Sequence, residues 1–112
     1  MGLLALGGCA ATPPTASLAQ ARDAIATAEQ AEAGRYAPGE LSAARAHLAS
    51  ADTAVSAQNM NTAQRLAEES TADAEFATAK TADIKANAVN NDMKRSTATL
   101  IDEMQRSAGV QQ

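Results

Sequence analysis

A chain of 112 residues with a net charge of −4 can form at most one domain, and this charge argues against nucleic-acid binding, which needs clustered Lys and Arg. Hydrophobic residues make up 46% of the chain, but 30 of them are alanine, and there is no Trp, one Phe and one Tyr. Alanine buries little apolar area and has the highest helix propensity. The composition therefore predicts an all-α protein with a thin hydrophobic core.

The first segment, residues 1–8, is an apolar run that ends at the single cysteine, Cys9. Leu6, Gly7 and Gly8 match a bacterial lipobox, in which an aliphatic residue and two small residues precede a cysteine that takes a diacylglycerol thioether. We therefore expect residues 1–8 to be part of a lipoprotein signal segment. Cys9 would become the acylated N-terminus after cleavage.

One part of a secretory signal is missing from this segment. No Lys or Arg precedes Arg22, although such signals begin with a basic region. The lipobox interpretation therefore expects the true start to lie upstream of Met1. The alternative is a cysteine that is incidental to a frayed terminus, since a single cysteine cannot form an internal disulfide.

The next segment, residues 9–16, contains two adjacent prolines, which favour extended polyproline II and predict a short tether. A first helix is predicted over residues 17–33. Ser17 and Gln20 match a capping box at its start. Gly34 is expected to end it, because glycine is favoured in the left-handed position after a helix.

Two glycines and a proline between Gly34 and Leu41 separate the first helix from a second helix, predicted over residues 39–57. Pro38 can occupy the first turn of that helix. Tyr36 is expected to pack over this end as a lid, with ligand stacking as the less favoured role. The second helix carries a strict three-four apolar spacing, typical of one buried face: Leu41, Ala44, Leu48, Ala51 and Val55.

A third helix is predicted over residues 61–88, with Asn61 and Gln64 as an N-cap pair. Together these elements, residues 17–88, form an alanine-rich domain whose expected architecture is an antiparallel helical hairpin or three-helix array. The predicted buried positions of the third helix are Ala63, Leu66, Ser70, Ala74, Ala77, Thr81 and Ile84.

Residues 87–92 are rich in Asn and Asp, which weaken a helix. The third helix therefore either continues through them as a long helix, with a bend, or gives way to a fourth helix at Met93. Residues 89–112 are predicted to be a helical tail that frays from Ala108. Four large apolar residues form a separate patch on it: Met93, Leu100, Ile101 and Met104.

No group of residues predicts a reaction. His47 is the only histidine, and without a cysteine or second histidine beside it a zinc site is disfavoured, so it is interpreted as a boundary residue on a helix. Several acids crowd the third helix, but Arg65 lies three and four residues before Glu68 and Glu69, and Lys80 can pair with Asp83. This spacing favours a solvated, salt-bridged face over a cation site. We expect no catalytic residue, no cofactor and no metal.

Three stretches carry a resemblance to a known family: "LGGCA", "AIATAEQAEAGRYAPGELSAARAHLASADTAV" and "AQRLAEESTADAEFATAKT". Over about Leu3 to Ala88 the chain resembles the short alanine-rich bacterial lipoprotein domain of unknown function that often precedes an OmpA-like, peptidoglycan-binding domain. The resemblance implies a helical-hairpin body, an envelope location and no assigned catalysis. No motif for direct peptidoglycan binding is found.

The leading hypothesis is a non-enzymatic lipoprotein of the cell envelope, held in membrane lipid through Cys9, whose helical body docks an unknown envelope protein. Ala10, where some lipoproteins have Asp, resembles the pattern that sends lipoproteins to the outer membrane, so its periplasmic face is the expected location. The alternative is a self-associating alanine-rich coiled-coil structural lipoprotein. Gly34, Pro38 and Gly39 argue against one continuous helix of that kind.

Overall fold

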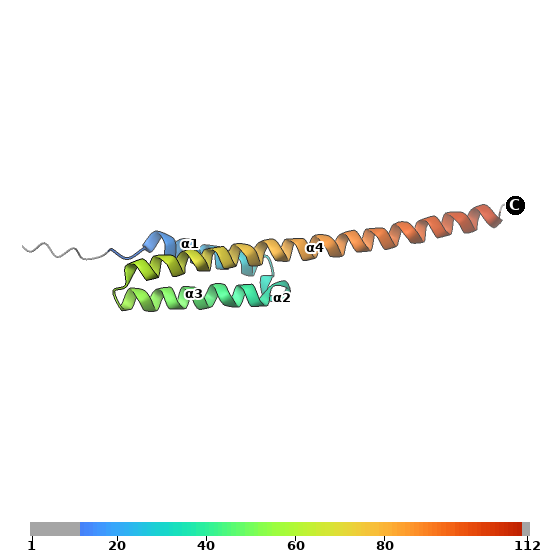
Figure 1. The fold of residues 1–112 in the computed structure, drawn as a ribbon. Coiled ribbons are helices and arrows are strands. Elements are labelled where there is room, and N and C mark those ends of the chain that lie inside the picture. The colour runs from blue at the N-terminus through green and yellow to red at the C-terminus, as the bar shows by residue number, and fades with distance from the viewer. Residues whose placement is uncertain (1–11, 111–112) are drawn as a thin grey trace, which may run out of the picture.

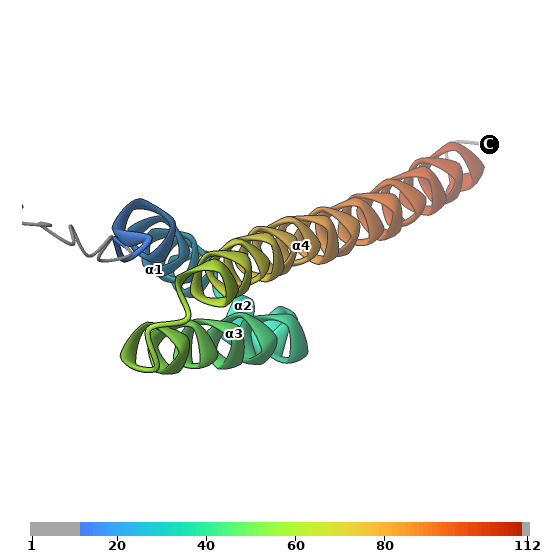
Figure 2. The ribbon, with the colours of Figure 1, turned by 60° about the vertical axis from the view of Figure 1, so that its left-hand side comes forward.

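The computed structural model describes residues 12–110, which form four helices and no strand. Helices α1 (Thr15–Gln30) and α3 (Pro38–Ser56) lie alongside the first half of α4 (Met60–Val110), and the single-turn α2 (Ala33–Tyr36) joins α1 to α3 (Figure 1). α4 packs against both other long helices and runs antiparallel to α3 (Figure 2). The all-α class and the three-helix array with a long last helix are confirmed.

The start of α1 differs from the expected capping box. The helix begins at Thr15, with Pro14 at the N-cap and no side-chain cap. The carbonyl of Pro14 accepts the Leu18 N–H at 3.0 Å. Because the fixed φ of proline suits entry into a helix, the helix begins directly after the prolines. Ser17 therefore lies inside the first turn and cannot cap it.

The end of α1 also differs from expectation. α1 ends at Gln30, and the left-handed residue that follows is Glu32, with φ 71°, rather than Gly34. Gly34 lies inside α2, and no described glycine has a positive φ. Pro38 does occupy the first turn of α3, as predicted.

The turn between α3 and α4 begins and ends one residue earlier in the chain than the sequence predicts. Gln58 takes a left-handed φ of 60°, and α4 begins at Met60. The Ala63 N–H bonds to the carbonyl of Asn59, at 3.0 Å. Asn61 is thus already helical, and the predicted N-cap at that position is wrong.

The core is thin and consists mostly of alanine. Within residues 12–110, the buried apolar residues that are not alanine are Leu18, Ile25 and Leu41. Small side chains let helix axes approach to about 8 Å, so close backbone packing takes the place of large side chains. The predicted stripes of α3 and α4 do face this core, with Leu48, Val55, Leu66 and Ile84 half-buried at its edges.

α4 is one helix of 51 residues and passes through residues 87–92 without a break. The predicted alternative of a fourth helix at Met93 is wrong. Two polar side chains of this segment bond to side chains one turn away rather than to the backbone: Asn87 donates to Asp83, and Asp92 accepts from Arg95 at 2.8 Å. The helix also continues past Ala108, where fraying was expected.

Candidate functional site on the exposed part of α4

The second half of α4 projects beyond the bundle. Every residue from Ala86 to Val110 is exposed, whereas α1 and α3 cover the helix before that point. At 1.5 Å per residue this projection is about 37 Å long. Figure 1 shows it leaving the bundle as a single rod. Within residues 12–110, no helix is both long and apolar enough to cross a membrane.

Large apolar side chains lie along this projection, and each is at least half exposed: Val89, Met93, Leu100, Ile101 and Met104. Four of these belong to a longer set of residues on one face of the helix. The spacing between successive members of this set repeats as four, three and four residues. We call this set the tail stripe: Ala82, Ala86, Val89, Met93, Thr97, Leu100, Met104 and Ala108. Ile101 lies beside it. The repeat of eleven residues fills about three helical turns, so the stripe stays on one side of the rod.

The tail stripe continues a groove on the bundle. This groove lies between α1 and α4 and has mostly small side chains along its walls: Ala24, Thr27, Glu75, Thr78, Ala79 and Ala82. Ala82 belongs to both features. An elongated apolar surface therefore starts beside α1 and runs on along the uncovered part of α4.

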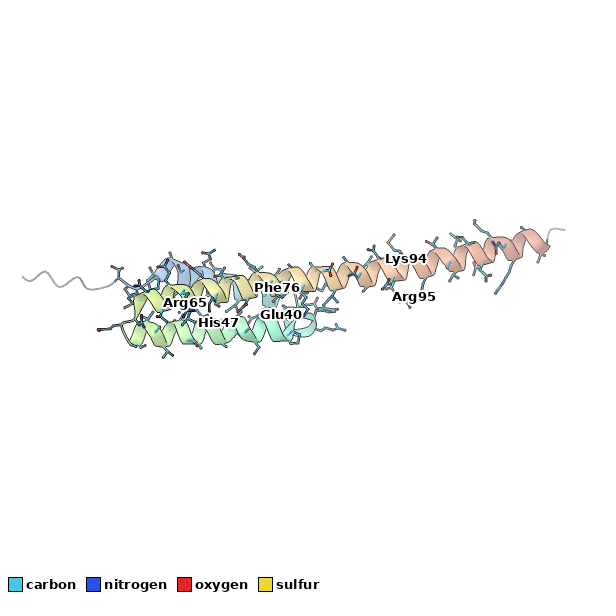
Figure 3. All side chains as sticks on the ribbon, in the orientation of Figure 1. Glu40, His47, Arg65, Phe76, Lys94 and Arg95 are labelled. Atoms are coloured by element: carbon cyan, nitrogen blue, oxygen red, sulfur yellow. The ribbon has the colours of Figure 1, made fainter. Side chains whose placement is uncertain are left out.

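His47 links α3 to α4 through carboxylates. Its Nδ1 lies 2.6 Å from Oδ2 of Asp73, and its Nε2 lies 3.6 Å from Oε2 of Glu69. Glu69 also accepts a hydrogen bond from Arg65 at 2.6 Å, which confirms that predicted pair. Figure 3 shows His47 and Arg65 on the side of the bundle where α3 and α4 meet. Among the described residues, no cluster of His, Cys, Asp and Glu could hold a metal ion.

Lys80 pairs differently from the prediction. Its ammonium donates to Glu40 of α3 rather than to Asp83 of its own helix. This hydrogen bond, together with the N–H of Glu40 itself, lowers the pKa of the Glu40 carboxyl group. The charged side chains of α4 therefore form links between helices as well as pairs along one helix.

Lys85 forms a second polar link near the same end of the bundle, beside α2. Its Nζ donates to the carbonyl of Ala31 and to Oε1 of Glu32, both at 2.9 Å. Tyr36 is half-buried at this end, where Lys85 and Arg35 lie 5.3 and 5.2 Å from its ring centroid. The ring thus packs at the end of the bundle with two cations close to it.

The predicted lipid-attachment residues, Cys9 with Leu6, Gly7 and Gly8, lie outside the described residues. The predicted apolar patch of the tail is present and exposed. The sequence interpretation missed its continuation to Ala82 and the groove beside α1. The eleven-residue spacing is the signal that would have revealed the continuation.

A family model described as "Domain of unknown function (DUF4398)" matches residues 16–93. The chain belongs to this family. No curated protein and no solved structure matches it. The DUF4398 match covers the bundle and the first part of the tail stripe, and it ends at Met93. Leu100 and Met104 of the stripe therefore lie beyond the part of the chain that the DUF4398 model describes.

Proposed function

We propose that this protein is a lipid-anchored helical docking or scaffold module of the cell envelope, without enzymatic activity. The observation that carries this proposal is the exposed tail stripe. Soluble chains rarely leave a continuous row of large apolar side chains in water, and such rows are typical of protein interaction sites. A rod that projects from a small bundle presents this row to a partner along its length.

The anchor in this proposal is Cys9. The lipobox residues Leu6, Gly7 and Gly8 support acylation there, and residues 9–16 would serve as the tether between the lipid and α1. One acyl chain holds a protein only marginally, because each buried CH₂ contributes about 0.8 kcal/mol, so several chains on one cysteine make a stable anchor. With Ala10 after the cysteine, we place the module on the periplasmic face of the outer membrane.

Intact mass of the product tests the anchor. The gene is expressed with its natural upstream region, and the protein is extracted from membranes with detergent. We expect a mass that fits a chain beginning at Cys9 and carrying diacylglycerol and a further acyl chain. The matched control, Cys9→Ser, is expected to carry no lipid. An unmodified wild-type chain that still contains Met1 would contradict the anchor.

The second candidate is the self-associating coiled-coil structural lipoprotein. The eleven-residue repeat of the tail stripe favours it, since a long regular stripe suits another helix of the same kind. The left-handed turn at Glu32 and the start of α3 at Pro38 do interrupt the helices of the bundle, but α4 has no such break. Self-association through α4 is therefore compatible with a docking module, and it can be tested separately from the lipid anchor.

A further inference from the structure

We propose that the tail stripe is a self-association surface, along which α4 of a second copy packs in parallel and in register. The inference names the partner of the docking surface proposed above. It does not depend on lipid attachment at Cys9, because it concerns only α4 and the groove beside α1.

The shape of the surface suits a second helix. The stripe extends over about 39 Å from Ala82 to Ala108, at 1.5 Å per residue. Its eleven-residue period corresponds to about 3.67 residues per turn, at which two helices stay in contact with only a slight right-handed supercoil. Val89, Met93, Leu100 and Met104 would form the apolar seam.

The charges beside the stripe favour the parallel arrangement. Lys94 follows Met93 and lies on one flank of the stripe, while Asp92 precedes Met93 and lies on the opposite flank. In a parallel pair, each flank faces the opposite flank of the second copy. Lys94 of each chain then meets Asp92 of the other, two residues or about 3 Å away along the axis.

An antiparallel pair would bring identical flanks together. When two copies of the stripe overlap fully in the antiparallel direction, Lys94 of one chain lies close to Lys94 of the other, and the repulsion of these like charges destabilises the pair. Asp92 bonds to Arg95 within its own helix at 2.8 Å, but both side chains are more than two-thirds exposed. This pair within one helix is therefore weak, and Asp92 can instead pair with Lys94 of the other chain.

The bundle leaves room for the second helix. The groove between α1 and α4 continues the stripe at Ala82, and Ala24 and Ala79 on its walls are small enough for close helix approach. A second α4 can thus remain alongside the first where α1 begins to cover it. Lys94 and Arg95 lie on the projecting part of α4, clear of the bundle (Figure 3).

Sedimentation equilibrium of the full chain tests the association. The chain carries Cys9→Ser, which removes lipid and free thiol. We expect a dimer whose dissociation constant rises at least about tenfold with Leu100→Asp, because the carboxylate would be buried in the seam. Phe76→Asp is the matched control, since Leu100 and Phe76 are both 58% exposed on α4 but only Leu100 belongs to the stripe. This control is expected to dimerise as the parent does.

Engineered disulfides test the orientation. Ala86→Cys and Ala108→Cys are introduced one at a time into the Cys9→Ser chain. In a parallel, in-register pair both variants form interchain disulfides on mild oxidation, whereas an antiparallel pair can bring at most one of these positions to its own copy. Failure of either variant to cross-link would overturn the parallel arrangement.

Three further outcomes would overturn the pairing itself: a monomer at all concentrations, a trimer or larger assembly, or equal weakening by Leu100→Asp and Phe76→Asp. The intact-mass experiment tests the lipid anchor separately from the pairing of α4. A dimer without lipid at Cys9 would contradict the anchor but not the pairing. A monomer that carries lipid would contradict the pairing but not the anchor.

Discussion

Lys85 of α4 holds the end of α1 through two hydrogen bonds of 2.9 Å, one to the carbonyl of Ala31 and one to the carboxylate of Glu32. The first bond satisfies a carbonyl at the end of α1, where a positive charge is favoured by the helix dipole. The second holds a residue with a left-handed backbone. One side chain thus fixes the turn between α1 and α2 onto the helix that projects from the bundle.

Replacement of this lysine is expected to weaken the bundle. Lys85→Met keeps the length and apolar stem of the side chain but removes both hydrogen bonds, and we expect a loss of about 1 kcal/mol in the free energy of unfolding. Urea denaturation followed by circular dichroism measures it. Arg106→Met is the control, since Arg106 pairs with Asp102 on the exposed tail and the loss of this pair should cost less than about 0.5 kcal/mol. Equal losses in the two variants would contradict the role of Lys85.

The stability of the bundle is expected to fall in acid because of two glutamates. The hydrogen bond and charge of Lys85 lower the pKa of Glu32, and the hydrogen bond from Lys80 lowers the pKa of Glu40, both from an ordinary value of 4.5. A carboxyl group with a lowered pKa in the folded state stabilises that state above its unfolded pKa. This contribution is lost as pH falls through the folded pKa.

Thermal unfolding between pH 7 and pH 3 measures this effect. The double variant Glu32→Gln/Glu40→Gln should show a smaller fall in melting temperature below pH 5 than the parent chain. Glu103→Gln, on the exposed tail, serves as the control and should leave the fall unchanged. If the double variant lost stability in acid as steeply as the parent, these two ion pairs would not be the cause.

The backbone of Glu32 predicts an unusual order of substitutions. Glu32→Gly and Glu32→Ala remove the same carboxylate, but φ at this position is 71°, where a Cβ is strained and glycine is not. We expect the glycine variant to be the more stable of the two by about 1 kcal/mol. The difference between their urea midpoints measures the strain of a Cβ at this backbone conformation, because both variants lack the bond to Lys85. A more stable alanine variant would rule out strain at this turn.

Gly34 is expected to behave in the opposite way. It has no positive φ, and a Cβ built on it would meet the Leu41 side chain at 3.8 Å, an ordinary contact. Gly34→Ala should therefore raise the free energy of unfolding by roughly 0.5–1 kcal/mol, since alanine restricts the unfolded chain and favours helix. The same denaturation experiment measures the change. A marked loss of stability would show that this position needs glycine.

The buried faces of the helices were predictable because their spacing is regular. Leu41, Ala44 and Ala51 of α3 face the core, as the three-four spacing requires. Helix ends were less predictable, because local signals compete there. Ser17 has the residue type of a cap, yet the prolines before it start the helix earlier; Gly34 has the residue type of a helix terminator, yet the turn forms two residues before it.

Links between distant parts of the chain could not be read from spacing. Lys80 has Asp83 within reach on its own helix, but packing places Glu40 closer, and Lys85 likewise reaches Glu32 across the bundle. The exposed patch on the tail was visible in the sequence, although only the structure shows that no other described segment covers it. Lipid attachment at Cys9 stays a prediction.

Two buried hydroxyl groups on α4 make a final, paired prediction. Ser70 Oγ donates to the carbonyl of Ala44 at 2.7 Å, whereas Thr81 is 1% exposed and its Oγ1 has no hydrogen-bond partner among the described residues. A buried hydroxyl without a partner costs free energy, while a bonded one contributes about 1 kcal/mol. Thr81→Val, which has nearly the same shape, should therefore stabilise the bundle by about 1 kcal/mol, and Ser70→Ala should destabilise it by a similar amount.

Chemical denaturation of the two variants and of the parent chain measures both changes in the free energy of unfolding. Because both residues lie on the same helix and face the same core, the opposite signs would separate hydrogen bonding from general disturbance of the packing. A loss of stability in Thr81→Val would mean that its hydroxyl has a partner in solution, such as a buried water. An unchanged Ser70→Ala would mean that the bond to Ala44 does not help hold α3 against α4.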